Sequence, residues 1–163
     1  MLRRLRPGRL LPFLLVACAV LLAGCSGSDA PPQVTFTVAG QDRTTGPTQW
    51  CDLKVTDCTG DPAAEVHLGV PAGTPVQVAV AEELSATPWH VVFSYRGTDG
   101  QQVDGRSPVF AAGAQKDYTL ELPAPTDQLL TAQVQAFGIP SADPQTGQGE
   151  FLIRGSWVLV TDA

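Results

Sequence analysis

Apolar and polar residues alternate along much of the chain, and this period of two constrains the fold more than any other feature of the sequence. Four segments alternate in this way: residues 34–38 (VTFTV), 66–70 (VHLGV), 76–80 (VQVAV) and 118–122 (YTLEL). Successive side chains of a strand point to opposite faces of a sheet, so each segment predicts a strand with one buried face. Longer apolar runs at residues 89–95, 130–137 and 151–160 predict further strands.

Turn-forming residues separate these segments. They are PAGTP from Pro71, GTDG from Gly97, PAP from Pro123 and a Gly- and Pro-rich segment at residues 138–149. Only residues 81–86 (AEELSA) have a helical composition, and the proline that follows limits them to about one turn. Many short strands with regular turns predict an all-β fold. We expect an immunoglobulin-like β-sandwich of about seven or eight strands, with a small closed β-barrel as the alternative.

The N-terminus has the layout of an export signal. Four arginines among the first nine residues precede an uncharged run, LLPFLLVACAVLLAG, at residues 10–24. A transmembrane helix needs about 18 or more apolar residues, whereas this run is shorter and contains Pro12. We therefore expect residues 1–24 to be a cleaved lipoprotein signal peptide. Arg3 and Arg4 leave the twin-arginine export route open as an alternative to the general one.

The end of this run resembles the lipobox at which bacterial lipoproteins are cut and lipidated: Leu22, Ala23, Gly24 and Cys25. The small residues let the peptidase approach, and the Cys25 thiol is the predicted acceptor of the diacylglyceryl group. An ordinary cleavage site with a stray cysteine is the alternative. Two or three acyl chains, palmitate among them, hold a protein on a bilayer almost permanently. The sequence thus predicts a protein anchored on the extracytoplasmic face of the cell membrane.

The remaining chain divides into a tether and one domain. Residues 25–32 are the predicted lipidated cysteine and a flexible tether with a reach of about 25 Å. Residues 33–163 have a length that suits one β-sandwich domain with one core. The whole chain has ten basic and sixteen acidic residues. Cleavage of the leader removes four arginines, so the mature chain has six basic and sixteen acidic residues and a net charge of −10. Such a surface repels nucleic acid, so no nucleic-acid partner is expected.

Once Cys18 leaves with the leader and Cys25 is acylated, two cysteines remain available for pairing: Cys51 and Cys58 in the segment WCDLKVTDC. Disulfides persist outside the cytosol, so we expect these two to pair. Seven residues of straight strand span about 23 Å, whereas the Cα atoms of a disulfide lie about 5.5 Å apart, so pairing requires a chain reversal around residues 54–57. The alternatives are a zinc site, which would need two further ligands from His67, His90 or a carboxylate, and a redox pair, which favours C-x-x-C spacing.

His90 is the candidate for acid–base chemistry. It lies between Trp89 and Val91 on a predicted central strand, where a hydrogen-bonded structural histidine is the favoured interpretation. A hydrolase that uses His90 with a carboxylate is the alternative. His67 alternates with core residues and is expected to face solvent. The sequence contains no G-x-S-x-G, H-E-x-x-H or phosphate-loop motif, so we predict no catalytic residue and no cofactor.

A binding or scaffolding module of the cell envelope is therefore the predicted functional class. The expected partner is an envelope protein or a cell-wall component. Loops at the ends of a sandwich are the usual recognition elements, and the longest predicted loops cover residues 97–108 and 138–149. Trp50, Trp89 and Trp157 accompany strand residues and are predicted to be core rather than ligand anchors.

The ordered series WCDLKVTDC, GVPAGTPVQVAV and ATPWHVVFSY, with a late SWVLV strand, resembles an uncharacterised family of actinobacterial lipoproteins, domain of unknown function 2771. The resemblance is strongest over residues 50–95. It implies an exported, β-rich domain, and it carries over no catalytic residue.

The segments VPAGTPVQVAV and PWHVVF also resemble a cupredoxin, in which a histidine after such strands binds copper. That site needs a later cysteine and histidine, usually with an axial methionine. No cysteine follows Cys58, no histidine follows His90, and Met1 is the only methionine. The sequence therefore predicts no copper site of this type.

Overall fold

The structure is a computed structural model that describes residues 30–142 and 149–162 of the chain. The predicted signal peptide, the lipobox residues Leu22, Ala23, Gly24 and Cys25, and most of the predicted tether lie outside the described residues. The described residues from Pro31 onward form one compact unit, and the description below concerns this unit alone.

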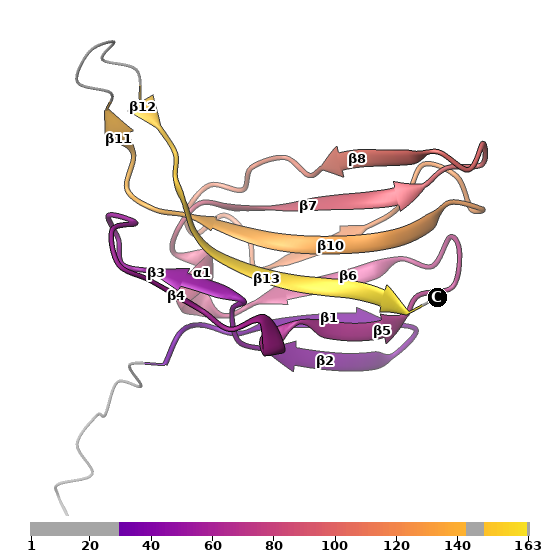
Figure 1. The fold of residues 1–163 in the computed structure, drawn as a ribbon, viewed down its shortest axis with the longest axis horizontal. Coiled ribbons are helices and arrows are strands. Elements are labelled where there is room, and N and C mark those ends of the chain that lie inside the picture. Colours follow the sequence, from indigo (N-terminus) through magenta and orange to yellow (C-terminus); the bar gives the residue numbers. More distant parts are fainter. Residues whose placement is uncertain (1–29, 143–148, 163) are drawn as a thin grey trace, which may run out of the picture. The chain divides into compact units, whose positions relative to one another are not determined.

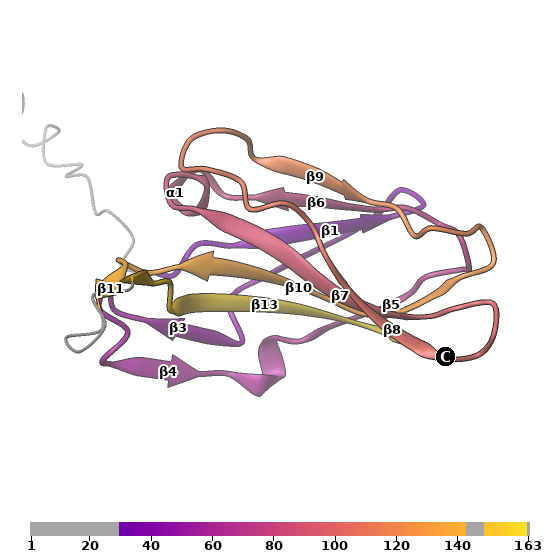
Figure 2. The same ribbon diagram turned by 90° about the horizontal axis from the view of Figure 1, so that it is seen from above.

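The smaller of two main sheets has four antiparallel strands in the order β2–β1–β6–β9 (Figures 1 and 2). They are β1 (Val34–Val38), β2 (Gln41–Thr45), β6 (Val76–Val80) and β9 (Asp117–Leu120). Every second residue of β1 and β6 is buried, as their alternation predicts. The β1–β2 hairpin turns at Ala39 and Gly40, which both have positive φ, the backbone that a two-residue hairpin of this handedness requires.

The larger sheet has seven strands, six of them in the order β4–β3–β13–β10–β7–β8. Its strands are β3 (Gln49–Cys51), β4 (Cys58–Gly60), β5 (Val66–Gly69), β7 (Trp89–Arg96), β8 (Gln102–Arg106), β10 (Gln128–Phe137) and β13 (Ile153–Asp162). β3 pairs antiparallel with the first half of β13, and β5 pairs parallel with its second half. A two-stranded ribbon, β11 (Ser141–Ala142) and β12 (Gly149–Glu150), extends the β10–β13 pair (Figure 1).

The two sheets pack face to face around one apolar core. Phe36 comes from the small sheet, Trp89 and Trp157 come from the large sheet, and each is fully buried. Trp50 is half-buried and packs against the same core, so the prediction that the three tryptophans belong to the core is confirmed. Burial of these large side chains supplies the main driving force for folding.

The prediction of an all-β sandwich is confirmed, and the closed-barrel alternative is wrong, because in the described part of the chain both main sheets have free edge strands. The structure has more strands than the seven or eight expected. The extra strands are short and mostly exposed, so their sequences lack the alternation that marks a buried face. The segment at residues 97–108 contains β8, so the prediction of a long loop there is wrong.

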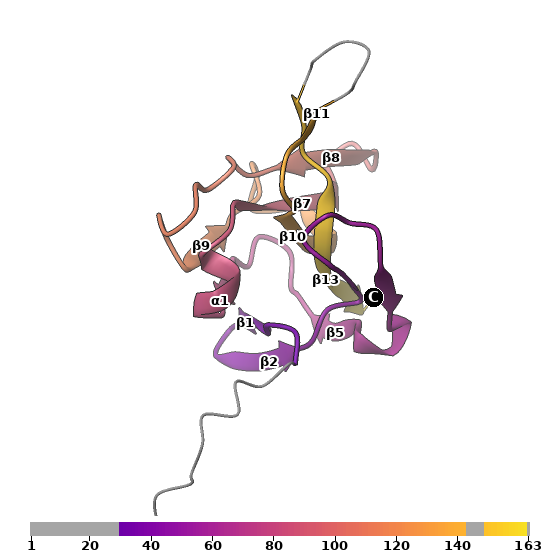
Figure 3. The ribbon, with the colours of Figure 1, turned by 90° about the vertical axis from the view of Figure 1, so that its left-hand side faces the viewer.

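Helical structure is limited to two short turns within the described residues. The predicted turn is α1 (Glu82–Ser85), which closes one end of the sandwich beside β1 (Figure 3). A 3₁₀ turn at Pro62–Ala64 was not predicted, and Asp61 caps it by accepting a hydrogen bond from the amide of Ala63. Over residues 30–142 and 149–162, no helix is long and apolar enough to span a membrane.

Candidate functional site

The outer face of the large sheet carries polar side chains from β7, β8 and β10. The strand register places Ser94 opposite both Thr131 and Asp104. It likewise places Gln133 and Arg106 on either side of Val92. Residues directly opposite each other share one face of a sheet, so these side chains form one surface, while their neighbours on β10 are buried in the core.

These residues line a shallow groove of about 560 Å³, which we call the outer-face groove. Its polar lining consists of Ser94, Gln102, Asp104, Arg106, Thr131 and Gln133. The hydroxyl oxygens of Ser94 and Thr131 are 2.8 Å apart, and the side-chain amide of Gln102 donates to a carboxylate oxygen of Asp104 over 3.4 Å. The groove therefore combines a guanidinium, a carboxylate, carboxamides and hydroxyls, which together can bind a ligand rich in hydrogen-bonding groups.

A second hollow continues along the same two strands. It has a volume of about 580 Å³, and Arg96 of β7 with Gln128 and Leu130 of β10 form part of its lining. The side-chain amide of Gln128 donates to the backbone carbonyl of Val70 over 2.8 Å, which fixes that side chain. The rest of its lining comes from residues 69–71 and from Thr161 and Asp162 of β13, so this hollow is separate from the outer-face groove.

His90 lies near the start of β7 and is 8% exposed. Its Nε2 atom is 2.8 Å from the side-chain oxygen of Gln135, directly opposite on β10. Because a carboxamide oxygen can only accept, Nε2 carries the proton in this arrangement. The ring packs on Phe137 at 4.9 Å between ring centres, and Nδ1 has no hydrogen-bond partner among the described residues. His90 is thus held by an amide and an aromatic ring.

His67 faces solvent, as predicted. Its Nδ1 atom is 3.4 Å from a carboxylate oxygen of Asp162, and both side chains are more than half exposed. The pairing follows from the parallel register of β5 and β13, which places His67 opposite Val160, two residues before Asp162. An exposed pair of this kind contributes little to stability.

Cys51 and Cys58 form a disulfide, as predicted. They lie directly opposite each other on β3 and β4, and the chain reverses between them as expected. The carboxylate of Asp52 holds this reversal, because it accepts hydrogen bonds from the amides of Thr56 and Asp57 at 2.7 and 3.2 Å. The amide of Thr56 and then that of Asp57 lower the pKa of Asp52 below its usual value.

Ionisable groups do not gather into a metal site within the residues that the structure describes: no group of three or more His, Cys, Asp or Glu side chains there could hold an ion. The two cysteines are joined to each other, so neither is available as a ligand for zinc. In this structure the pair is therefore a disulfide that joins β3 to β4.

The sequence did not identify the outer-face groove. Gln133 and Gln135 alternate with buried residues of β10, which is a signal that they point away from the core. Arg106 and Asp104 give no such signal, because β8 is an exposed edge strand without apolar alternation. Only the pairing of β7 with β8 and β10 brings these side chains together.

Comparison with known proteins identifies a family for most of this chain. A family model described as "Protein of unknown function (DUF2771)" matches residues 27–161, which include every described strand up to the penultimate residue of β13. Separate comparisons with curated proteins and with solved structures found no match. The chain therefore belongs to the DUF2771 family of proteins of unknown function.

Proposed function

We propose that this protein is a lipoprotein held on the extracytoplasmic face of the cell membrane through Cys25, and that its β-sandwich binds a polar component of the cell envelope. The outer-face groove is the observation that carries the binding proposal. It carries six polar side chains above an apolar floor that includes Val92, it is built from three strands of one sheet, and a rigid scaffold lowers the entropic cost of binding. The envelope component is a protein or a cell-wall polymer.

Two features support the location. The lipobox residues Leu22, Ala23, Gly24 and Cys25 stand just before residue 27, where the match to the family begins. The disulfide between Cys51 and Cys58 belongs to a compartment in which thiols oxidise. Acylation of Cys25 and the disulfide between Cys51 and Cys58 give each of the three cysteines after residue 24 a role.

The environment of His90 favours binding over catalysis. A general base is usually oriented by a carboxylate that stabilises the imidazolium, whereas the partner of His90 is the neutral carboxamide of Gln135. The ring is also mostly buried, which limits access of a substrate. We propose that His90 is a structural residue and that the protein is not an enzyme.

The anchor is tested by expressing the full chain and its Cys25→Ser variant in the native host. We expect the wild-type protein to leave the membrane fraction with detergent and not with salt, because acyl chains rather than charges hold it. Mass spectrometry of its N-terminal peptide should find a diacylglyceryl group on Cys25. An unmodified Cys25 at the N-terminus, or a leader that is still attached, would refute the lipoprotein proposal.

The binding surface is tested with two glutamines at matched positions on opposite faces of the sandwich. Gln133 lines the outer-face groove, whereas Gln77 lies on the outer face of the small sheet. In-cell crosslinking captures a protein partner, and co-sedimentation with purified cell wall detects a polymer. We expect Gln133→Ala combined with Arg106→Ala to reduce the bound fraction about tenfold, while Gln77→Ala leaves it unchanged. Equal binding by all variants would exclude the groove.

A further inference from the structure

Exposed apolar side chains are concentrated at one end of the sandwich. Among the described residues, five large apolar side chains are strongly exposed: Leu53 (51%), Val103 (40%), Val109 (57%), Ile139 (52%) and Phe151 (57%). Leu53 lies in the β3–β4 turn, Ile139 follows β10 and Phe151 follows β12. Figure 1 shows that these parts of the chain share the end that carries the β11–β12 ribbon. Val103 lies on β8 opposite Tyr95, towards the other end.

Five apolar residues at this end make up what we call the tether-end patch: Leu53, Val109, Phe137, Ile139 and Phe151. The amide of Ile139 donates to the carbonyl of Leu53 over 3.1 Å, and the rings of Phe137 and Phe151 are 5.8 Å apart. Phe137, Phe151 and Val109 line one apolar hollow of about 410 Å³ together with Pro88 and Ala111. Contiguous apolar surface of this kind marks an interaction site.

The chain enters the domain at the same end. The indole N–H of Trp157 donates to the carbonyl of Pro32 over 3.0 Å, and the amide of Ala81 donates to the carbonyl of Gln33 over 3.0 Å. Ala81 precedes α1, and Ser85 of α1 accepts a hydrogen bond from the amide of Gly113, four residues after Val109. Figure 3 looks onto this end and shows α1 beside β1. The point of entry and the patch therefore share one end of the sandwich.

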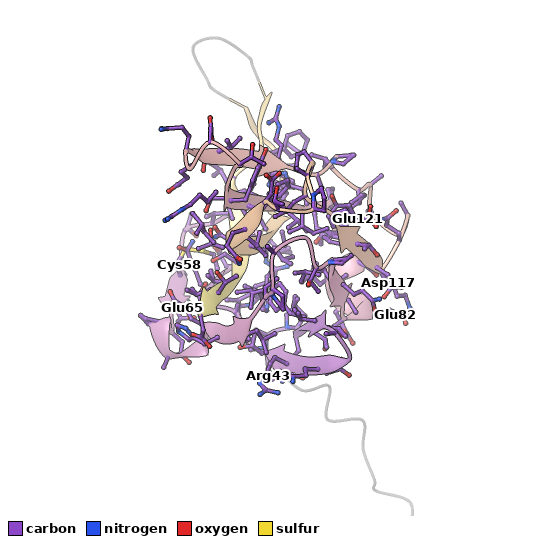
Figure 4. The ribbon with its side chains drawn as sticks, turned by 90° about the vertical axis from the view of Figure 1, so that its right-hand side faces the viewer. Arg43, Cys58, Glu65, Glu82, Asp117 and Glu121 are labelled. Atoms are coloured by element: carbon purple, nitrogen blue, oxygen red, sulfur yellow. A yellow bond between two sulfur atoms is a disulfide. The ribbon has the colours of Figure 1, made fainter. Side chains whose placement is uncertain are left out.

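The length of chain before the domain limits how far this end can move from a lipidated Cys25. The six steps from Cys25 to Pro31 span at most about 22 Å. The ten residues of β10 span about 33 Å, so the sandwich cannot stand on its opposite end while Cys25 is in the bilayer. Exposed carboxylates lie on the flanks, at Glu65 and Glu121 (Figure 4), and also at the tether end, at Asp52 and Asp57. The orientation therefore rests on the length of the chain and on the apolar side chains, and not on charge.

We infer that the tether-end patch sits in the boundary between the headgroups and the acyl chains of the membrane that holds Cys25. This inference rests on the proposed lipid anchor and adds a second, non-covalent contact with the same bilayer. Each large apolar side chain that moves fully out of water raises the membrane partition coefficient of the domain roughly tenfold. The exposed Lys54 beside Leu53 can reach headgroup phosphates. The sandwich then stands on its end, and the outer-face groove faces the aqueous envelope.

The test uses the full mature protein, purified from its host with its N-terminal modification verified by mass spectrometry. It is reconstituted into phosphatidylcholine vesicles that contain a phosphatidylcholine with a photoactivatable acyl chain. After illumination, we expect peptides that contain Leu53, Val109 or Phe151 to carry about tenfold more label than the peptide that contains Val103. Leu53→Ser with Phe151→Ser should remove most of the label from Val109, whereas Val103→Ser should leave it unchanged.

Thermal unfolding of each variant verifies that these exposed substitutions leave the fold intact. Acylated protein with equal label at both ends, or with no label at the patch, would overturn the inference and leave the lipoprotein proposal standing. Cross-links that join the patches of two copies would also overturn it, because the patch would then be a protein interface. Protein with an unmodified Cys25 would refute both proposals, and the mass spectrum separates that outcome from the others.

Discussion

The indole ring of Trp50 lies against the backbone of Gly155, so closely that a β-carbon on this glycine would come within 2.6 Å of a ring carbon. The two residues are direct partners in the β3–β13 pairing. On its other sides the ring meets Trp157 edge-on, at 5.7 Å between ring centres, and the guanidinium of Arg154 at 4.0 Å. The absence of a side chain at Gly155 thus creates the space in which Trp50 joins the core.

Replacement of Gly155 by alanine should lower the free energy of unfolding by about 1–3 kcal/mol, because the Trp50 ring or the β13 backbone must shift to accept the methyl group. Denaturant unfolding followed by tryptophan fluorescence measures this change. Gly46→Ala is the matched control, since no atom lies within 4 Å of a β-carbon at that position. Equal effects of the two substitutions would show that close packing at Gly155 is not the cause.

Loss of the disulfide should lower the free energy of unfolding by about 2.5 kcal/mol in the chain-entropy model, because the unfolded chain regains the freedom of the small ring. The double variant Cys51→Ser, Cys58→Ser measures the effect at equilibrium. Treatment of the wild-type protein with a reductant should produce the same shift, and the double variant should not respond to it. A reductant response in the double variant would mean that another bond is being reduced.

The β3–β4 reversal should loosen in acid. Amide hydrogen bonds lower the pKa of Asp52, so the folded state binds this proton less tightly than the unfolded state does. The stabilisation is therefore complete above about pH 4, the usual aspartate range, and is lost as the pH falls through the lower pKa of the folded state. Hydrogen exchange of the Thr56 and Asp57 amides, measured from about pH 5 to pH 3, checks this sign.

Asp52→Asn keeps an oxygen acceptor and removes the charge. Once the intrinsic pH dependence of exchange is subtracted, this variant should give nearly constant protection over the same range. Protection of the wild-type amides that stays constant on acidification would contradict a role for the Asp52 carboxylate.

Gln135→Ala should destabilise the domain by about 1–3 kcal/mol, because it leaves the protonated Nε2 of the buried His90 without a partner. Gln133→Ala, two residues earlier on the same strand, should stay within about 0.5 kcal/mol of the wild type because its side chain lines an open groove. The two unfolding curves, measured side by side, distinguish a structural glutamine from a surface one. Similar losses for both variants would argue against a specific bond to His90.

Sequence patterns predicted the strands that build the core. β1, β6 and β10 each bury every second residue over most of their length, and burial of one face is what produces alternation in a sequence. The strands that were missed are edge strands or short strands. β2 reads QDRTT and exposes four of its five residues, so its strand character comes from hydrogen bonding to β1 rather than from its own side chains.

One of the candidate sites was predictable from the sequence, and the other was not. The disulfide was predictable because few cysteines remain and the chain between Cys51 and Cys58 can reverse. The outer-face groove was not, because Ser94, Arg106 and Gln133 come from three strands and meet only through the register of the sheet. The solvent exposure of Phe151 was also missed, since the residue belongs to an apolar run that predicted a strand and β13 begins two residues later.

β13, almost the last segment of the chain, lies in the middle of the large sheet, where β3, β5 and β10 all pair with it. Contacts between residues so far apart in the chain close late and slow the search for the native state. Strands made early, such as β3 and β5, have no partner on their β13 side until β13 has been synthesised. The small sheet can pair earlier, because its four strands all precede residue 121, whereas a chain that stops before β13 cannot assemble the large sheet.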